Sequence, residues 1–367
     1  MRFEIRESAA WLREQLDRVC LWHWEIVRLR RRDGYPFDIL YMGRKAHRVE
    51  LAKVLTVRED SVDTRQANAK PSSRTVLVSE IPIPGALCVP QFLTAVVPLG
   101  RSIEEVMAEY EYKLRRNISR QRTLYRRQQV MKEDEIDRAH REMLYPFANA
   151  RHGSAAIQKS SDYVQKSALG YGRLDFLLAG DEVVGCMLGN ESIRAGRRYW
   201  VADRCGYPEA VFSDPKRLAE TNSINIHMAL EWAIENGFDY CDLGRCFASP
   251  DDGLLQFKRR RGAELDSIGL RGLGYFHIRL PKLGTAKFLW DTPLFAVEHQ
   301  RLTLHLGLPA GTTDDEFIAR HRQMGFGGLF KVYLHSTRPL GEDLLATLGH
   351  LYKHQKSPPL LKSITSM

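Results

Sequence analysis

The residues best placed to carry out chemistry lie close together in the sequence, in the stretch Gly237–Asp266. Asp242 and Arg245 stand where a short apolar run, residues 238–243, has the pattern of a buried strand that ends at a glycine. Lys258 follows after a loop, near the start of a further helix. A carboxylate, a guanidinium and an ammonium group gathered where a buried strand ends are typical of a ligand site in an α/β sheet.

The same stretch carries a family resemblance. Three runs follow one another in order: Asp242 to Arg245 (DLGR), Phe257-Lys258 (FK) and Arg261 to Ala263 (RGA). They resemble the D-(F/L)-G-R…F-K…(W/R)-G pattern of FemAB-related proteins, which belong to the acyltransferase superfamily built on the GNAT fold. The resemblance implies an α+β (mixed α/β) chain with a GNAT-like fold, arranged as two tandem GNAT-like domains. It also implies an enzyme that transfers acyl or aminoacyl groups.

In Fem-type transferases the lysine of the F-K pair lies near the reacting groups. The resemblance therefore implies a catalytic role for Lys258, whose cation would stabilise an oxyanion or a tRNA phosphate, with Asp242 as a second catalytic candidate. Arg259 is expected to bind substrate and Arg245 to bind the donor. Two plainer alternatives remain open. The four basic residues from Lys258 onward can form a phosphate-facing surface, and Arg245 can pair with Asp242 or Glu264.

A third catalytic candidate is Asp203. In GNAT folds, as the resemblance implies, the donor lies where the fourth and fifth strands separate, and the corresponding runs here are residues 198–202 and 238–243. Asp203 comes directly after the first of them, where it can act as a base or orient the acceptor. The alternative is a turn carboxylate that pairs with Arg204 or Arg245, since most ion pairs are structural.

The donor is not fixed by the sequence. Acetyl-CoA-using members of the superfamily normally have a glycine-rich loop before the helix, where backbone N–H groups bind the pyrophosphate. Residues 213–223 contain no glycine, so binding of coenzyme A in the usual manner is not expected. FemAB relatives also lack this loop, and those that are understood take an aminoacyl group from tRNA. Donor-binding candidates within the segment are Lys216, Arg217, Thr221, Asn222 and Ser223.

Charge points to an anionic partner. The formal net charge is +9, and the largest basic run, Lys113 to Lys132, contains no acidic residue. Arg115, Arg116 and Arg120 in this run are expected to contact a phosphate-bearing substrate, and the sequence there resembles the helix that joins the two halves of Fem-type chains. The alternative is that the run forms the solvated face of a helix.

Hydrophobic periodicity predicts the elements that must position these residues. Ser102 opens a long helix through a capping box, whose buried stripe continues to Tyr125, and helices follow at residues 133–147 and 161–169. Three strands joined by tight turns, then a helix and a strand, give the order of a GNAT core. The three strands are predicted at residues 174–178, 183–188 and 198–202, the helix at 222–236 and the last strand at 238–243.

Outside this core the pattern is less regular. Residues 1–32 have a helical pattern, strands are predicted at 37–42, 49–57, 76–83 and 86–97, and residues 59–74 are predicted to be a loop. We expect a strand at 272–280, helices at 287–306 and 312–324, and a strand at 328–335 that completes the sheet of the first domain. The tail after Lys353 is expected to be loose.

These predictions give a domain plan. The expected parts are an N-terminal GNAT-like half (1–100), a basic connecting helix (101–132), an acyltransferase domain (133–280) and a C-terminal extension that returns to the first domain (281–367). The N-terminus lacks the apolar segment of a secretory signal, and no apolar run is long enough to span a bilayer. The six cysteines show no metal-binding spacing, so we expect reduced thiols, a cytoplasmic protein and no metal site. His227 lies in an apolar helix and is expected to be a core residue.

Two functions remain open. The favoured one is a bacterial acyltransferase that moves an acyl or aminoacyl group from acyl-CoA or aminoacyl-tRNA to an amine or hydroxyl of a cell-envelope or polysaccharide precursor, with no tightly bound cofactor. The alternative is a non-catalytic nucleic-acid- or phosphate-binding protein that uses the basic run 113–132.

Overall fold

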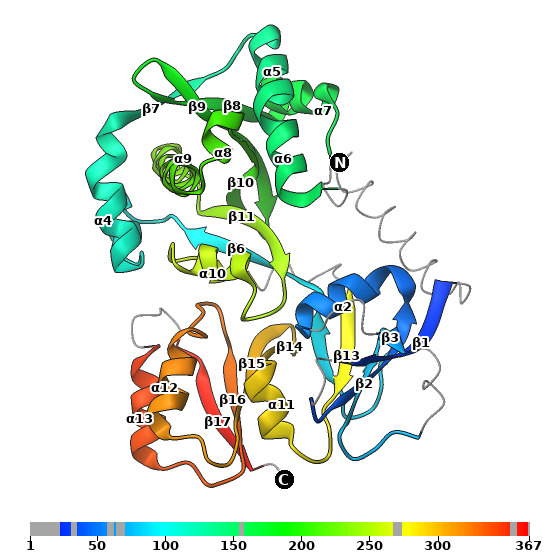
Figure 1. Ribbon diagram of the computed structural model, residues 1–367. Helices are drawn as coiled ribbons and strands as arrows, with labels where there is room; N and C mark the ends of the chain where they lie inside the picture. The colour runs from blue at the N-terminus through cyan, green and yellow to red at the C-terminus, as the bar shows by residue number, and fades with distance from the viewer. Residues whose placement is uncertain are drawn as a thin grey trace. The chain divides into compact units, whose positions relative to one another are not determined.

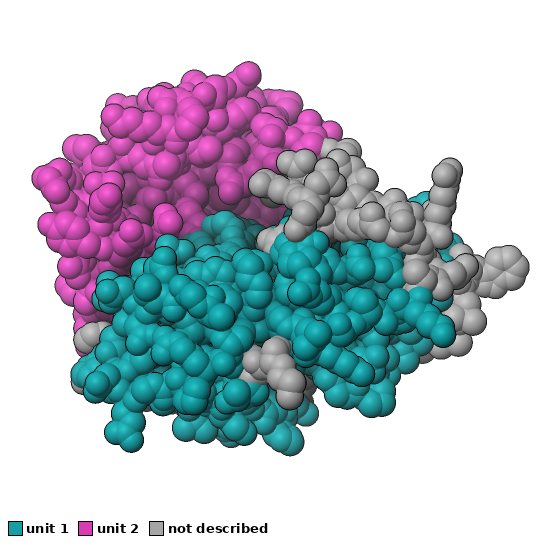
Figure 2. Space-filling view, turned by 60° about the horizontal axis from the view of Figure 1, so that its bottom comes forward, with its two compact units in different colours: residues 1–93, 245–256, 265–367 teal, residues 94–244, 257–264 magenta. Residues whose placement is uncertain are grey.

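The computed structural model describes residues 23–30, 35–56, 62–63, 70–153, 158–266, 274–352 and 358–365. The chain forms two compact units (Figures 1 and 2). Unit 1 comprises Met1–Leu93, Arg245–Gln256 and Leu265–Met367, and unit 2 comprises Thr94–Gly244 and Phe257–Glu264. One boundary therefore falls inside the DLGR run, between Gly244 and Arg245.

The sheet of unit 2 carries most of the predicted site residues. Its strands run in the order β12-β6-β11-β10-β9-β8-β7. β7 to β10 form an antiparallel meander, whereas β10 and β11 are parallel because the helix α9 (Pro215–Glu235) connects them. This is the order that the resemblance implied, so the predictions of a mixed α/β fold and a GNAT-like core are confirmed. The bounds are β6 Phe92–Pro98, β7 Tyr125–Gln129, β8 Gly172–Ala179, β9 Glu182–Arg194, β10 Arg197–Gly206, β11 Tyr240–Phe247 and β12 Glu264–Leu265.

Two features stabilise the meander: glycine residues in its turns and helices that pack against the sheet. Gly180 and Gly196 both have positive φ, 60° and 75°, which a tight hairpin requires and which glycine adopts without strain. α9 packs against the sheet through β9 (Figure 1). The helices α5 (Glu133–Ala139), α6 (Tyr145–His152) and α7 (Ser161–Lys166) confirm the two predicted upstream helices, with π-helical turns at His140–Leu144 and Ser167–Tyr171. Buried side chains from α5, α7, the two π-helical turns, β8 and β9 form one apolar cluster.

The prediction of one long helix after Ser102 is wrong, although the predicted capping box of Ser102 with Glu105 is present. It is divided into α3 (Ile103–Ala108) and α4 (Tyr112–Gln121), because the N–H of Glu111 leaves the helical pattern and donates to the carbonyl of Arg260. After a 3-10 turn (Arg122–Leu124) the chain becomes the strand β7. The buried acid Asp175 on β8 pairs with Arg127 at 2.5 Å, which anchors this basic segment as an edge strand.

Unit 1 contains an N-terminal sheet in the order β3-β1-β2-β4-β13-β5. β1 and β2 are antiparallel, α2 (Arg48–Val54) follows, and β4 is parallel to β2. Antiparallel strands followed by a helix and a parallel strand repeat the order of unit 2 in reduced form, in agreement with the predicted tandem arrangement. The bounds are β1 Trp24–Arg30, β2 Asp38–Arg44, β3 Val62–Asp63, β4 Thr75–Ser79, β5 Leu87–Pro90 and β13 Tyr275–Arg279.

Two predictions in this region are wrong. Trp24–Arg30 is a strand and not a helix, while residues 1–22 and 31–32 of the predicted helical segment lie outside the described residues. The strand predicted at 49–57 is the helix α2, since Leu51, Val54 and Leu55 bury one helical face. The predicted strands at 76–83 and 272–280 are confirmed as β4 and β13, and the run 86–97 is divided into β5 and β6 at Gln91.

The rest of unit 1 is a C-terminal sheet in the order β14-β15-β16-β17. The helix predicted at 287–306 ends early, as α11 (Thr285–Asp291), and is followed by a hairpin whose turn residues His299 and Gln300 both have positive φ. The predicted helix at 312–324 is confirmed, with a capping box at Thr313. The predicted strand at 328–335 is β16, but it belongs to this sheet, and the tail contains β17. The bounds are β14 Leu294–Glu298, β15 Arg301–Leu308, α12 Asp314–Arg322, β16 Lys331–Ser336, α13 Glu342–His350 and β17 Leu360–Thr365.

Five cysteines fall in the described part of the chain, and all are free thiols: Cys88, Cys186, Cys205, Cys241 and Cys246. Among the helices that the structure describes, none combines the length and the apolar character needed to cross a lipid bilayer.

Candidate functional site

The two parallel strands at the centre of unit 2 separate partway along their length. β10 and β11 pair from Tyr199 opposite Tyr240 to Val201 opposite Asp242. β10 continues to Gly206 and β11 continues through Gly244 to Phe247, and no register joins the two strands over these described residues. The prediction that the strand ends at Gly244 is therefore wrong. A separation of parallel strands leaves backbone donors and acceptors available for a ligand.

Asp203 lies at the start of this separation. The register of β10 against β9 shifts between Ala202 and Arg204, so Asp203 is the extra residue of a β-bulge. The Tyr163 hydroxyl donates to Asp203 Oδ2 at 3.3 Å, and Arg204 Nε lies 3.8 Å from the same oxygen. Burial and the Asp203 charge raise the pKa of Tyr163, so this hydroxyl keeps its proton. Asp203 therefore has the predicted structural partner Arg204, and its side chain also keeps 24% exposure.

Asp242 is engaged on both carboxylate oxygens. Its Oδ1 accepts the backbone N–H of Gly244 at 2.7 Å, and its Oδ2 lies 2.7 Å from Arg194 Nη2. The side chain is buried. The ion pair thus runs to Arg194, which sequence reasoning did not identify. A carboxylate with both oxygens occupied in this way positions the Gly244 turn, whose φ is +83°, and is poorly placed to exchange protons.

Lys258 lies near the end of the helix α10 (Gly253–Arg259) and is buried, with 3% exposure. Its Nζ donates to the carbonyl oxygen of Gly244 at 2.6 Å. The FK and DLGR runs, separated by a loop in the sequence, therefore meet at one residue.

The basic residues after Lys258 differ in burial: Arg261 is buried, Arg259 is half-buried and Arg260 is exposed. Arg261 is 3% exposed, donates to the carbonyl of Phe257 at 2.8 Å and to Ser223 Oγ at 2.9 Å, and covers the Phe257 ring. Burial lowers the pKa of Arg261 to about 10. Arg260 pairs with Glu111 at 3.3 Å. Burial also lowers the pKa of Arg259, which is half-buried. Arg245 is exposed.

The donor-binding candidates on α9 do not converge. Asp214 caps the helix and accepts the N–H groups of Lys216 and Arg217 at 2.9 and 3.1 Å, and Arg217 pairs with Glu182 at 2.8 Å. Because the helix begins at Pro215, the remaining candidates lie inside it and do not cap it. Thr221 is buried, Asn222 accepts from the Tyr207 hydroxyl at 2.8 Å, and Ser223 donates to the carbonyl of Ala219 at 2.7 Å.

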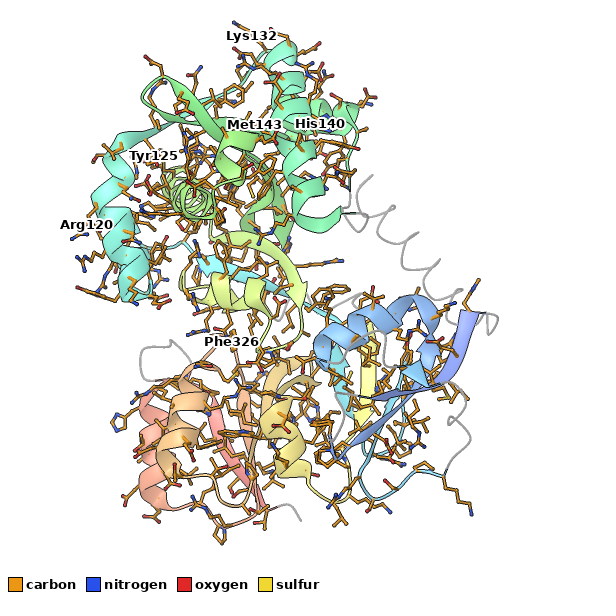
Figure 3. All side chains as sticks on the ribbon, in the orientation of Figure 1. Arg120, Tyr125, Lys132, His140, Met143 and Phe326 are labelled. Carbon is orange, nitrogen blue, oxygen red and sulfur yellow. The ribbon has the colours of Figure 1, made fainter. Side chains whose placement is uncertain are left out.

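The basic run divides into buried and exposed parts. Arg122 pairs with Glu231 at 2.7 Å, and Arg127 pairs with Asp175 as described. Arg115 donates to the Ala108 carbonyl at 3.3 Å. Arg116 and Arg120 on α4 are exposed and have no acidic partner within the described part of the chain. Figure 3 shows Arg120 on the outer side of α4, pointing away from the sheet.

His227 is a core histidine, as predicted. It is 2% exposed, and its two ring nitrogens lie 3.2 Å from the Tyr110 hydroxyl and 3.3 Å from Glu231. Over the residues with described positions, no group of three or more histidine, cysteine or acidic side chains is arranged to hold a metal ion.

Comparisons with known proteins find several solved structures of similar fold but no matching sequence. No protein-family model and no curated protein matches the sequence. Among solved structures, FemX is similar at 12% identity and a TM-score of 0.38, over 71% of this chain and 89% of that one. L-PGS from Bacillus licheniformis is similar at 12% identity and a TM-score of 0.34, over 70% of this chain and 84% of that one. A GCN5-related N-acetyltransferase from Anabaena variabilis is similar at 9% identity and a TM-score of 0.30, over 92% of this chain and 85% of that one.

Proposed function

We propose that unit 2 is an acyltransferase centre, in which an acyl or aminoacyl group passes to an amine or hydroxyl where β10 and β11 separate. The observation that carries the proposal is the coincidence of this separation with the bulge at Asp203. Acyl transfer needs donors for the carbonyl oxygen of the acyl group and a base for the proton of the acceptor. The separated strands supply backbone N–H groups, and Asp203 supplies an accessible carboxylate.

The roles of the other residues follow from their contacts. Tyr163 orients Asp203 through its hydroxyl. Asp242 and Lys258 act through Gly244, so in this proposal they are positioning residues that fix the path of β11 at the reaction centre. Lys258 holds a carbonyl oxygen and is buried, which suits a fixed structural cation better than a mobile phosphate ligand.

The start of α9 bears on the donor. A helix N-terminus binds phosphate through free N–H groups, but here the Asp214 carboxylate occupies those of Lys216 and Arg217. A second anion at this position would meet charge repulsion. We therefore propose a donor that does not place a pyrophosphate there, such as an aminoacyl-tRNA, whose phosphates can meet the exposed Arg116 and Arg120. The acceptor in this proposal is an envelope or polysaccharide precursor.

Donor consumption tests the proposal directly. Purified protein is incubated with either aminoacyl-tRNA or acetyl-CoA and a pool of amine- and hydroxyl-bearing envelope precursors, and release of deacylated tRNA or free thiol is followed. We expect tRNA deacylation that needs the acceptor pool and is lost in Asp203→Asn. Thiol release would replace the tRNA donor by acyl-CoA. Binding of tRNA without consumption of either donor would favour the non-catalytic alternative.

A further inference from the structure

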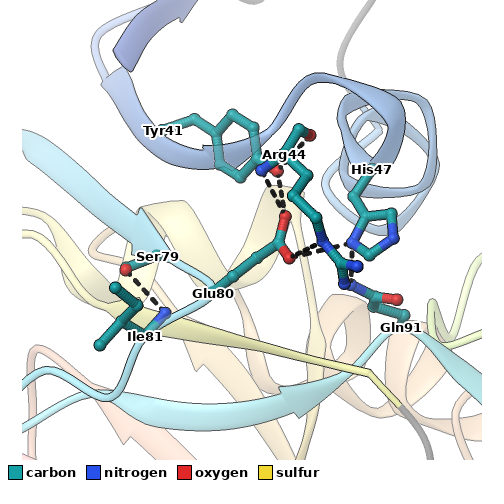
Figure 4. A network of polar contacts seen from close by, with 7 residues as sticks. All are labelled: Tyr41, Arg44, His47, Ser79, Glu80, Ile81 and Gln91. Carbon is teal, nitrogen blue, oxygen red and sulfur yellow. Dashed lines mark hydrogen bonds and ion pairs between the residues drawn. The ribbon is translucent and has the colours of Figure 1, made fainter. Parts of the chain in front are cut away.

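The buried charges of the polar cluster around Glu80 in unit 1 are held by several partners (Figure 4). The Glu80 carboxylate accepts from the Tyr41 hydroxyl at 2.6 Å and from Arg44 N and Nε at 2.8 and 2.9 Å. Its second oxygen also lies 3.0 Å from His47 Nδ1. Burial opposes the ionisation of Glu80, but the hydrogen bonds with His47 and Tyr41 outweigh burial and lower its pKa to about 2. Contacts on both oxygens show that this carboxylate serves the fold.

Arg204 on β10, beside the proposed base Asp203, is held differently. Its Nε atom is buried and has no hydrogen-bond partner within the described part of the chain. Asp203 Oδ2 lies 3.8 Å from Nε, which is close enough for attraction but too long for a hydrogen bond. By contrast, the buried guanidinium groups of Arg127 and Arg261 both donate hydrogen bonds. A largely buried guanidinium without acceptors costs free energy that a bound anion would recover.

Arg204 is also accessible to a ligand. Its side chain keeps 17% exposure and that of Asp203 keeps 24%, so both reach the surface. The two terminal nitrogens of Arg204 also lack a partner among the described residues, but they are not enclosed. Beyond Val201 no register joins β10 to β11 over the described residues. A small molecule can therefore meet the carboxylate and the guanidinium together.

A second cation lies near Tyr163, the residue that orients Asp203. Lys159 Nζ is 4.6 Å from the centre of the Tyr163 ring. Within the described ranges, no acidic side chain pairs with Lys159. Two positive charges and one negative charge thus surround Tyr163, and one further anionic group would balance them.

We propose that Arg204 binds an anionic group of the acyl acceptor, a carboxylate or a phosphate, next to the amine that Asp203 receives. The role of the amine rests on the proposed function of unit 2, whereas the anion site does not. An ammonium group beside an anion carries the charges of Asp203 and Arg204 in reverse, so it matches both side chains at once. A guanidinium holds two oxygens of a carboxylate or phosphate through parallel hydrogen bonds. The acceptor is therefore zwitterionic, like the end of an amino acid or an aminoalkyl phosphate.

The transfer balances with such an acceptor. The ammonium group gives one proton to Asp203, which passes it to solvent. The free amine attacks the acyl carbonyl carbon, and a C–N bond forms as the bond from that carbon to the ester oxygen of the donor breaks. The second amine proton leaves with that oxygen as a hydroxyl group, so each amide formed releases one proton.

Nuclear magnetic resonance of the full chain labelled with 15N-arginine tests the site without any donor, with the Arg204 Nε signal assigned from the Arg204→Gln variant. Glycine and phosphoethanolamine are the probes. Ethanolamine has the amine without the anion, and potassium chloride controls for ionic strength. We expect a saturable shift of the Arg204 Nε signal with at least one probe, at concentrations several-fold below those at which ethanolamine acts. The tighter probe identifies the anion as a carboxylate or a phosphate.

Three variants sharpen the test, with binding followed through the signals of the probe. Arg204→Gln should weaken binding at least several-fold, and Arg204→Lys, which keeps the charge without the planar fork, should retain part of it. Arg141→Gln removes the same charge from a 71% exposed side chain of unit 2 and should bind like the parent. Arg204→Gln should melt at or above the temperature of the parent, because it removes a largely buried charge that has no hydrogen bond.

The outcomes separate this inference from the proposed function. No response at Arg204 to either probe, an equal response to ethanolamine, or full binding by Arg204→Gln would each overturn the inference. Donor consumption that needs Asp203 but is indifferent to Arg204→Gln at limiting acceptor would also overturn it, and would leave the transferase proposal standing. Anion binding at Arg204 without consumption of any donor would support the site and contradict the transferase proposal alone.

Discussion

Asp242 and Lys258 hold the same residue through opposite groups of its backbone. Asp242 accepts the N–H of Gly244 at 2.7 Å, and Lys258 donates to its carbonyl oxygen at 2.6 Å. Gly244 has a φ of +83°, which disfavours other residue types. The D-x-G element and the distant lysine therefore meet at one residue of β11, close to the point where this strand leaves β10.

Replacing Lys258 by methionine should destabilise unit 2. The change leaves the Gly244 carbonyl without its buried donor, which costs on the order of 1–3 kcal/mol. Urea unfolding followed by tryptophan fluorescence measures the loss. Lys258→Arg retains a donor and should lose less, although the larger guanidinium must fit a buried position. A Lys258→Met protein that is as stable as the parent but inactive would instead assign Lys258 to the chemistry itself.

Asp203→Asn should remove turnover without weakening the fold. Loss of a general base typically costs 100- to 10,000-fold in rate, to order of magnitude, while the partly exposed Asp203 contributes little burial. Tyr163→Phe removes only the orienting hydroxyl and should cost less. Steady-state kinetics and thermal melting of the two variants separate these effects. If Asp203→Asn keeps its rate, the bulge is structural and the base lies elsewhere.

The sequence predicted unit 2 better than unit 1 for identifiable reasons. In the meander, β8 and β9 contain short apolar runs of buried residues, and glycine turns at Gly180 and Gly196 bound the strands, so local pattern and tertiary structure agree. In unit 1 the valines in and near α2 favour a strand by their intrinsic propensity. The burial of Leu51, Val54 and Leu55 on one face stabilises a helix there instead. The predicted helix at 287–306 included residues 301–306, yet these belong to the strand β15, where Leu302, Leu304 and Leu306 stand at every second position.

The site was predicted in part. The DLGR and FK runs indicated that Asp242, Gly244 and Lys258 belong together, but not which atoms meet. Arg194 and Tyr163, the partners of Asp242 and Asp203, stand far from them in the sequence, and no local pattern marks them. The same holds for His47 and Glu80, which only the parallel course of β2 and β4 brings together.

Arg116 and Arg120 should govern the salt dependence of tRNA binding. If each contacts one phosphate, the double change to glutamine should reduce the slope of log K against log salt concentration by roughly 1.4–1.8. Filter binding over a range of salt concentrations measures the slope. Lys70→Gln with Lys282→Gln removes the same charge from exposed positions in unit 1 and is the matched control. Equal slopes for the two double variants would show that only net charge matters.

Acidification should weaken unit 1 through two histidines in the C-terminal sheet. His305 and His335 are buried, and their ring nitrogens lie 3.0 Å apart. Burial, and for His305 also the neighbouring His335, lowers the pKa of His305 to about 3, and burial lowers that of His335 to about 4, from the ordinary 6.5. The unfolded chain therefore takes up protons below pH 6.5 that the folded chain cannot accept.

The free energy of unfolding should consequently be highest above pH 6.5 and fall as the pH drops toward 4, by up to ~1.4 kcal/mol per pH unit for each histidine. Glu80 contributes nothing over the upper part of this window, because its lowered pKa removes stability only below its ordinary value of 4.5. Urea unfolding at pH 7 and pH 5 measures the difference. His305→Gln with His335→Gln should have a smaller difference than the parent, while His299→Gln, at an exposed turn, should keep the full one. A parent protein equally stable at both pH values would show that the buried pair accepts protons in the folded state.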